Sequence, residues 1–442
     1  MKTVIEKIRN IWAVKDVRNK ILFTALILLL YRIGAAIPVP YVSANIMQSF
    51  SQAYGGTILE YLNLLSGSAL SQATLFALSI SPYITASIVL QLLTVAIPAL
   101  QRMSKEEDGK KKISQITRIV TVALAILTSF AYYSLLKRGT NGTSWLTTSA
   151  LPEWFRAVVI IACFTAGSAI IMWLGEKINE HGIGNGISMI LFANILSRLP
   201  AIVNSFITMF TDWGVWTAIA VVALCLTVAI IGFIIFVTNS EHRIPVQYSK
   251  RVIGRKMYGG QNTNLPLKLN MSGVMPIIFA SSIVSLPATI FTLFGYSKNS
   301  EGFIGTLLKT LETTSPLYIV IYIALIIAFS YFYILISFDP IEVSNNLKKN
   351  GGTVLGIRPG APTATYIKRV LNRITLIGAI FLSIVAGLPL IINAIASGLN
   401  YTALSGLAFG GSSLLIVIGV ALETYRAIEA QMAMRHYKGF LQ

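Results

Sequence analysis

SQATLFALSISPYITASIVLQLLTVAI, residues 71–97, is the stretch that decides the class of this protein. Its 27 positions hold no charged residue, and about 20 apolar residues are enough for a helix to cross a hydrocarbon core of roughly 30 Å. Similar runs recur along the 442-residue chain, which is 55% hydrophobic and 12% charged. Because a soluble domain has about twice that charged fraction, the composition excludes disorder and an ordinary cytosolic enzyme. The sequence predicts an all-α polytopic membrane protein.

Ten membrane-spanning helices are expected from the apolar windows between polar breaks. Ten spans would put both termini on one side, and five helices per half would make the second half inverted relative to the first, as in many transport proteins. We therefore expect an N-terminal half over 21–206 and a C-terminal half over 207–424. The predicted spans are 21–37, 71–97, 116–136, 155–174, 182–206, 215–237, 272–293, 317–338, 374–395 and 403–422.

The basic residues orient these helices. Lys and Arg number 35 against 17 Asp and Glu, a formal net charge of +18. When each one is assigned to a loop or to the nearer end of a span, 28 lie on the side of the termini and 6 on the opposite side, with Arg32 inside the first span. Short cytoplasmic loops are enriched in Lys and Arg, so both termini are predicted to be cytoplasmic. Trp145, Trp154, Trp213 and Trp216 fall at the predicted outer boundaries, where amphipathic rings are favoured.

Two terminal segments lie outside the predicted spans. Residues 1–20 carry six basic residues beside an apolar stripe that includes Ile5, Ile8 and Trp12, which predicts an amphipathic helix on the cytoplasmic membrane surface. This segment lacks the apolar core of a cleavable signal peptide. Residues 425–442 are expected to form a cytoplasmic tail.

Three predicted spans hold more polar and small residues than a lipid-facing helix needs. In the second span, Ile80, Ile84, Ser87 and Gln91 follow one helical face. The fifth span begins with glycines and an asparagine, and the seventh contains prolines and serines. Polar residues at membrane depth normally face protein or water, so these helices could line a cavity. Helix packing through small residues is the alternative that spacing leaves open.

Residues 57–70, TILEYLNLLSGSAL, are apolar but too short to span a membrane. One interpretation is a re-entrant helix that returns into the bundle from outside, where it must lie inside protein or against water. An interfacial helix on the outer surface fits the pattern equally well.

The histidines and cysteines form no catalytic or metal-binding pattern. Cys163 and Cys225 lie in apolar runs, and His181, His242 and His436 are far apart. We therefore expect no enzyme activity, no cofactor and no metal. The absence of Asp, Glu or His at mid-span disfavours a proton-coupled carrier. Two function classes other than a channel stay open at this point. The first is a secondary transporter of a small solute, and the second, with less support, is a membrane-embedded enzyme.

Two predicted cytoplasmic loops, 238–271 and 339–373, are longer than a helix bundle needs and carry six basic residues each. Such loops could dock an anionic partner, although topology alone also predicts basic cytoplasmic loops.

Several stretches of the sequence are specific enough to point to a family: RIGAAIPVP, LLSGSALSQATLFALSISPYITASIVLQLL, GEKINEHGIGNGIS, RIPVQYSKR, GGQNTNLPLKLN, MPIIFASSI and NNLKKNGGTVLGIRPG. With them the chain resembles the SecY family of protein-conducting channels over essentially its whole length. At position 264 the family pattern has His where this chain has Asn264, and at position 191 it has Ile where this chain has Leu191.

The resemblance implies a clamshell of two five-helix halves around an hourglass pore, which conducts unfolded secretory polypeptides and opens sideways to lipid. The 57–70 segment would be the plug. The residues that correspond to the pore ring are Ile80, Ile84, Leu191, Ile278 and Ile416, and those of the plug are Ile58, Leu59, Tyr61, Leu62, Leu64 and Leu65.

The resemblance also implies a lateral gate, a docking surface and partners. The gate residues would be Ser87, Gln91, Ser281 and Ser282, and the docking residues Arg243, Lys250, Arg251, Arg255 and Arg358. The implied partners are the SecE and SecG subunits, the SecA motor ATPase, the ribosome, polypeptides that carry signal peptides, and the lipid bilayer, with no direct DNA binding. The implied location is the bacterial cytoplasmic membrane.

Overall fold

The computed structural model is mostly helical. It describes residues 9, 11–43, 50, 59, 62–63, 66–139, 144–147, 151–200, 203–204, 207, 215–248, 251–253, 256–258, 262–293, 302–312, 315–398 and 410–438. The predicted helix over 1–20 lies partly outside these residues, whereas α2 already begins at Lys15.

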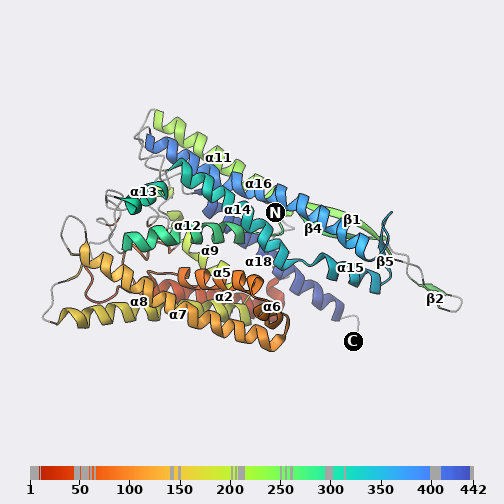
Figure 1. Ribbon diagram of the computed structural model, residues 1–442, viewed down its shortest axis with the longest axis horizontal. Helices are drawn as coiled ribbons and strands as arrows, with labels where there is room; N and C mark the ends of the chain where they lie inside the picture. Colours follow the sequence, from red (N-terminus) through yellow and green to blue (C-terminus); the bar gives the residue numbers. More distant parts are fainter. Residues whose placement is uncertain are drawn as a thin grey trace.

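Two groups of helices flank a central set, as Figure 1 shows. One group comprises α2 (Lys15–Gly34), α5 (Ser81–Ala96), α7 (Glu107–Arg138) and α8 (Glu153–His181). The other comprises α11 (Val215–Asn239), α14 (Pro316–Ser337) and α16 (Ala361–Gly398). Between them lie α9 (Gly186–Leu196), α12 (Met275–Leu293) and α18 (Gly410–Lys438). Three shorter helices are α6 (Pro98–Lys105), α13 (Phe303–Thr310) and α15 (Pro340–Lys349).

The central helices join the two groups. Helix α12 packs against α5 and α7 on one side and against α14 on the other, and α18 packs against both α9 and α16. One cluster of buried apolar side chains runs through these contacts, from Tyr31 on α2 to Val420 on α18. A second cluster surrounds Tyr132 and Phe164 on α7 and α8.

Several of these helices are long and apolar enough to cross a membrane. Within the residues that the structure describes, α7, α8, α14 and α16 meet that criterion, and α5 with α6 would make a fifth span. The bend between α5 and α6 is 109° and falls where Pro98 begins α6. Helices α9, α11 and α12 contain shorter apolar stretches. The protein is therefore a multi-pass membrane protein, and the number ten stays a prediction.

The prediction of one continuous helix over 71–97 is wrong for its first ten residues. Residues 66–80, which we call the 66–80 segment, form successive turns, and α5 begins only at Ser81. Ala73 and Ser79 have positive φ angles of 47° and 51°, which interrupt a right-handed helix. Pro82 lies in the first turn of α5, where its missing N–H costs no hydrogen bond. Hydropathy could not separate the buried turns from the helix.

Other predicted boundaries also shift. Helix α9 begins at Gly186 rather than at 182, because the Asn185 side chain accepts hydrogen bonds from the N–H groups of Ile187 and Ser188 and caps the helix there. The predicted loop before the third span is mostly helical, as α6 followed by the start of α7. Helix α16 begins at Ala361 instead of 374, and α18 continues through the predicted tail to Lys438.

The two long basic loops form one folded unit. Strand β1 (Glu241–Tyr248) pairs antiparallel with β4 (Asn262–Lys268) from the same loop and with β5 (Gly352–Val354) from the other loop. Strands β2 (Arg251–Ile253) and β3 (Lys256–Tyr258) pair at the tip. Apolar residues of the sheet, including Ile244 and Val246, pack against Ile367 and Leu371 of α16. Figure 1 shows this sheet, which we call the hairpin sheet, at the end of the molecule where α6 and the C-terminus lie.

Candidate functional site

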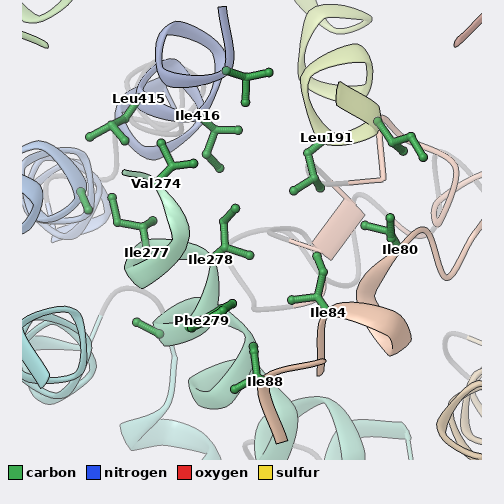
Figure 2. Close-up of a cluster of buried hydrophobic side chains, with 14 of the residues drawn as sticks. Ile80, Ile84, Ile88, Leu191, Val274, Ile277, Ile278, Phe279, Leu415 and Ile416 are labelled. Carbon is green, nitrogen blue, oxygen red and sulfur yellow. The ribbon is translucent and has the colours of Figure 1, made fainter. Parts of the chain in front are cut away.

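Five branched apolar side chains come together at the centre of the molecule. Ile80, Ile84, Leu191, Ile278 and Ile416 are all at most 7% exposed and belong to one buried cluster. They come from the end of the 66–80 segment and from α5, α9, α12 and α18. Figure 2 shows their side chains gathered around one space, with those on α5 and α9 opposite those on α12 and α18. We call this set the apolar ring.

A cavity of about 170 Å³ lies beside the apolar ring. Ile84, Leu191, Ile278 and Ile416 form one part of its wall. Leucines that precede α5 form another part: Leu59, Leu62 and Leu70. Hydroxyl groups are placed around it on α5, α7 and α12, from Ser81, Thr85, Thr128, Ser281, Ser282 and Ser285. A cavity with mainly apolar walls and a few hydroxyls suits an apolar group.

The 66–80 segment is anchored to three different elements. The Tyr132 hydroxyl on α7 donates a hydrogen bond to the Leu70 carbonyl oxygen. The Leu75 N–H donates to the Ile37 carbonyl oxygen at 2.9 Å, in the chain after α2. On α8, a Cβ added to Gly167 would lie 1.9 Å from the Leu75 carbonyl oxygen, so only glycine allows this approach. These contacts fix the backbone that leads into Ile80.

The plug residues can be placed only in part. Ile58, Tyr61, Leu64 and Leu65 lie outside the described residues. Leu59 is 2% exposed and packs in the cluster that contains Tyr132 and Phe164, and Leu62 packs against the same cluster. Both leucines also line the cavity.

The four predicted gate residues lie on neighbouring helices, α5 and α12, but their hydrogen bonds stay within each helix. Gln91 donates to Ser87 at 3.4 Å, and Ser281 and Ser282 both donate to the Ile278 carbonyl oxygen. In the part of the chain that the structure describes, none of these four side chains bonds across the seam. A serine in an apolar helix commonly satisfies its hydroxyl on the preceding turn in this way.

Different hydroxyls of α5 line the cavity. Ser81 and Thr85 are four residues apart on the same face as Ile84 and contribute to its wall, as does Ser285 on α12. The sequence analysis did not predict Ser81 and Thr85 as site residues, because it considered the helix face that contains Ser87. Their spacing from Ile84 was the available signal, since residues three and four positions apart share one face of a helix.

Three of the five predicted docking residues lie on or near the hairpin sheet. Arg243 lies on β1 with 69% of its side chain exposed, and Arg251 begins β2. Arg358 is exposed in the turn before α16, and its carbonyl oxygen accepts a hydrogen bond from the Thr363 hydroxyl at 2.8 Å. Lys250 and Arg255 lie outside the described residues. The strand pairing thus brings the two loops together.

A second cavity, of about 250 Å³, lies near the hairpin sheet and is lined by two basic side chains. Lys268 at the end of β4 and Arg426 on α18 line it together with Glu423. Burial lowers the pKa of the Lys268 amine, and the positive charge of Arg426 lowers this pKa further. The Arg426 guanidinium donates to the Thr238 carbonyl oxygen and to the Asn239 side chain at 3.1 and 2.9 Å. Among the described residues, no group of three or more His, Cys, Asp or Glu could hold a metal ion.

The arrangement can be compared with known proteins. The model of the SecY family matches residues 74–425, and a curated relative, the protein translocase subunit SecY of Mycobacterium bovis, is 44% identical over 97% of both chains. The chain belongs to the SecY family. Another SecY relative, from Streptomyces coelicolor, is 42% identical over the same share of both chains.

Solved structures of SecY-family channels share the fold. A structure described as a protein-conducting channel has a TM-score of 0.62 at 17% identity, and it covers 94% of this chain and 92% of its own. A second structure, on the plug domain of SecY, has a TM-score of 0.65 with the same identity and coverage. The prediction of a SecY-family protein-conducting channel is confirmed, and the alternative of a small-solute transporter is not favoured.

Proposed function

We propose that the apolar ring is the seal of the protein-conducting pore. The observation that carries this proposal is the convergence of five branched apolar side chains from four helices and one turn segment. A constriction lined by such side chains excludes water and therefore ions. It can also give way around a passing polypeptide without offering fixed polar contacts. Such a channel needs no catalytic residue.

We propose that residues 57–70 act as the plug behind this ring. The location of Leu59, Leu62 and Leu70 in the wall of the cavity supports this role. A plug of this kind would be held by apolar contact and by the anchored 66–80 segment, and it would leave when a polypeptide enters.

The seam between α5 and α12 is the proposed lateral exit. These helices are adjacent, and in the described part of the chain no hydrogen bond between the four predicted gate side chains joins them. A seam closed mainly by apolar contact can open to lipid at low cost. A signal segment would then partition into the membrane, since each Leu or Ile contributes about −0.3 to −0.6 kcal/mol at the helix centre whereas Asp or Arg costs about 2.5 to 3.5 kcal/mol.

The hairpin sheet is the proposed docking surface for SecA and the ribosome, and its exposed basic residues support this assignment. The proposed companion subunits are SecE and SecG, and the proposed location is the bacterial cytoplasmic membrane. The distribution of Lys and Arg along the chain supports ten spans with both termini in the cytoplasm. A fold neighbour at TM-score 0.59 is described as Sec61 in a canine ribosome-channel complex.

Reconstitution into vesicles tests the proposed function. The protein, with its companion subunits and a motor ATPase, should move a signal-bearing unfolded polypeptide into the lumen, and planar bilayers that contain it should conduct few ions at rest. Counterflow of a small solute, without transport of the polypeptide, would support the transporter alternative instead.

A further inference from the structure

Asn194 on α9 is fully buried. It links α9, which carries Leu191 of the apolar ring, to the 66–80 segment, which carries Ile80. Its side-chain N–H donates a hydrogen bond at 3.4 Å to the hydroxyl of Ser79, 115 residues away in the chain. Asn194 lies about one helical turn after Leu191, and Ser79 immediately precedes Ile80. One buried hydrogen bond between side chains thus connects the two chain segments that carry Leu191 and Ile80.

The backbone at Ser79 needs such a contact. Its φ of 51° is in the left-handed region, which a residue other than glycine adopts only where the surrounding structure holds it. Inside the segment, the Ser79 N–H donates to the Phe76 carbonyl oxygen at 2.9 Å. The bond from Asn194 ties this strained residue to α9.

The other end of the 66–80 segment meets the same part of α9. Gly67 has a φ of 66°, and a Cβ added there would lie 3.2 Å from the Asn194 carbonyl oxygen and 3.0 Å from the Ser197 hydroxyl oxygen. The Ser197 hydroxyl itself donates to that carbonyl oxygen at 2.7 Å. Asn194 therefore lies close to both ends of the segment, with its side-chain amide hydrogen-bonded to Ser79 at one end and its backbone carbonyl oxygen near Gly67 at the other.

A buried aromatic pair covers this junction. Tyr31 of α2 is fully buried and stacks on Phe76 of the 66–80 segment, with ring centroids 5.3 Å apart. A Cβ added to Gly34 would lie 2.2 Å from the Phe76 ring, so α2 leaves no room for the ring to move toward it. The packing of Phe76 on Tyr31 and against Gly34 thus also holds this part of the segment against α2.

We propose that Asn194 is a positioning residue that holds the 66–80 segment, and with it Ile80 and the base of the plug, in the sealed arrangement. This inference rests on the proposed role of the apolar ring. Loss of the bond releases the strained backbone at Ser79 and shifts the resting channel toward open states. A purely structural role in packing would instead change the stability of the fold without changing the seal.

The test compares Asn194→Ala and Ser79→Ala, in the complete reconstituted channel, with the unmodified protein. Both variants should raise the resting ion conductance in planar bilayers by roughly threefold to tenfold, the effect expected from one buried hydrogen bond. Both should also admit substrates with weakened signal sequences. Because the two residues act through one bond, the double variant should leak no more than the worse single variant.

Two controls make the outcome decisive. Ser330 on α14 is also fully buried and donates only within its own helix, so Ser330→Ala should leave the resting conductance unchanged. Ile84→Asn changes the ring itself and should leak in any case. If Ile84→Asn leaks while folded Asn194→Ala and Ser79→Ala stay sealed, the role of Asn194 is excluded and the proposed pore survives. If Ile84→Asn also stays sealed, the proposed pore fails. Should Asn194→Ala not fold, Ser79→Ala alone decides.

Discussion

The hydroxyl of Tyr132 on α7 donates a hydrogen bond to the carbonyl oxygen of Leu70, which lies 62 residues earlier in the chain. Tyr132 is fully buried and packs edge-to-face on Phe164, with ring centroids 5.0 Å apart. Leu70 joins the proposed plug to the 66–80 segment. A helix of the N-terminal group therefore holds the base of the proposed plug directly.

Tyr132→Phe should loosen the base of the plug while it preserves the aromatic packing. Because the Leu70 carbonyl oxygen still accepts the Ala73 N–H at 3.2 Å, the loss in unfolding free energy should be only about 0.5–1.5 kcal/mol. Thermal unfolding in detergent measures this loss. A cysteine introduced at Leu59, in protein whose two native cysteines are replaced by alanine, should react faster with a thiol reagent. The neighbouring Tyr133→Phe should change neither quantity.

A polar residue in the apolar ring should wet the constriction. Ile84→Asn or Ile416→Asn places an amide among branched apolar side chains, which favours water there and stabilises open states. We expect a resting ion leak in planar bilayers and acceptance of substrates with weak signals. Ile84→Leu keeps the apolar surface and should stay sealed. A folded asparagine variant that neither leaks nor relaxes signal stringency would exclude the sealing role.

A link across the proposed lateral exit should block secretion. Thr85 on α5 and Ser282 on α12 line the same cavity, whereas Ser87 does not. In cysteine-free protein, the pair Thr85→Cys with Ser282→Cys should react with a short thiol-to-thiol crosslinker faster than the pair Ser87→Cys with Ser282→Cys. The linked channel should fail to translocate signal-bearing substrates. Faster linking of the Ser87 pair would show that α5 presents another face to α12.

Reversal of the Arg358 charge, beside the hairpin sheet, should weaken motor binding and leave the fold intact. Arg358 is exposed, and an exposed charge contributes little to stability. Arg358→Glu should therefore lower the affinity for the motor ATPase and its ATP-driven translocation at an unchanged unfolding temperature. Lys368→Glu makes the same charge change on the exposed side of α16 and serves as the control. Equal loss in both variants would point to net charge rather than to a docking contact.

The cation pair near the hairpin sheet should be detectable by titration. Burial lowers the pKa of the Lys268 amine most, and the charge of Arg426 lowers it further. Arg426→Gln should therefore raise this pKa part of the way toward 10.5, whereas Arg426→Lys should leave it unchanged because the charge remains. The pH dependence of acetylation at Lys268, followed by mass spectrometry, reports the pKa. A folded amine with a lowered pKa resists protonation, so the unfolding free energy of the unmodified protein should rise with pH between the folded pKa and 10.5. Arg426→Gln should reduce this rise.

Hydropathy predicted the helices well because burial in lipid imposes long apolar runs, as in α7, α8, α14 and α16. It failed at residues 71–80, where the chain is equally apolar but buried in protein, and where positive φ angles at Ala73 and Ser79 leave no mark in a hydropathy profile. Pro82 was the visible sign that a helix begins there.

The composition of the apolar ring came from family resemblance, and its assembly needed the structure. Ile80 and Ile84 share a face by spacing, but nothing local in the sequence brings Leu191, Ile278 and Ile416 to them. The contact between Asn194 and Ser79 spans 115 positions and has no local signal either. The sequence analysis did not predict the hairpin sheet, because it considered only the basic charge of the two loops. The alternation of Ile244 and Val246 with exposed residues on β1 is the pattern of a strand with one buried face.

The hairpin sheet also has a consequence for channels that are crowded together in one membrane. Strand β1 lies in the centre, so the open edges belong to β4 and β5. Strand β5 has only three residues, and Pro266 removes one backbone donor from β4. Short or proline-containing edges are poor templates for strand addition. Neighbouring copies that meet at the hairpin sheet are therefore not expected to extend it into a continuous intermolecular sheet.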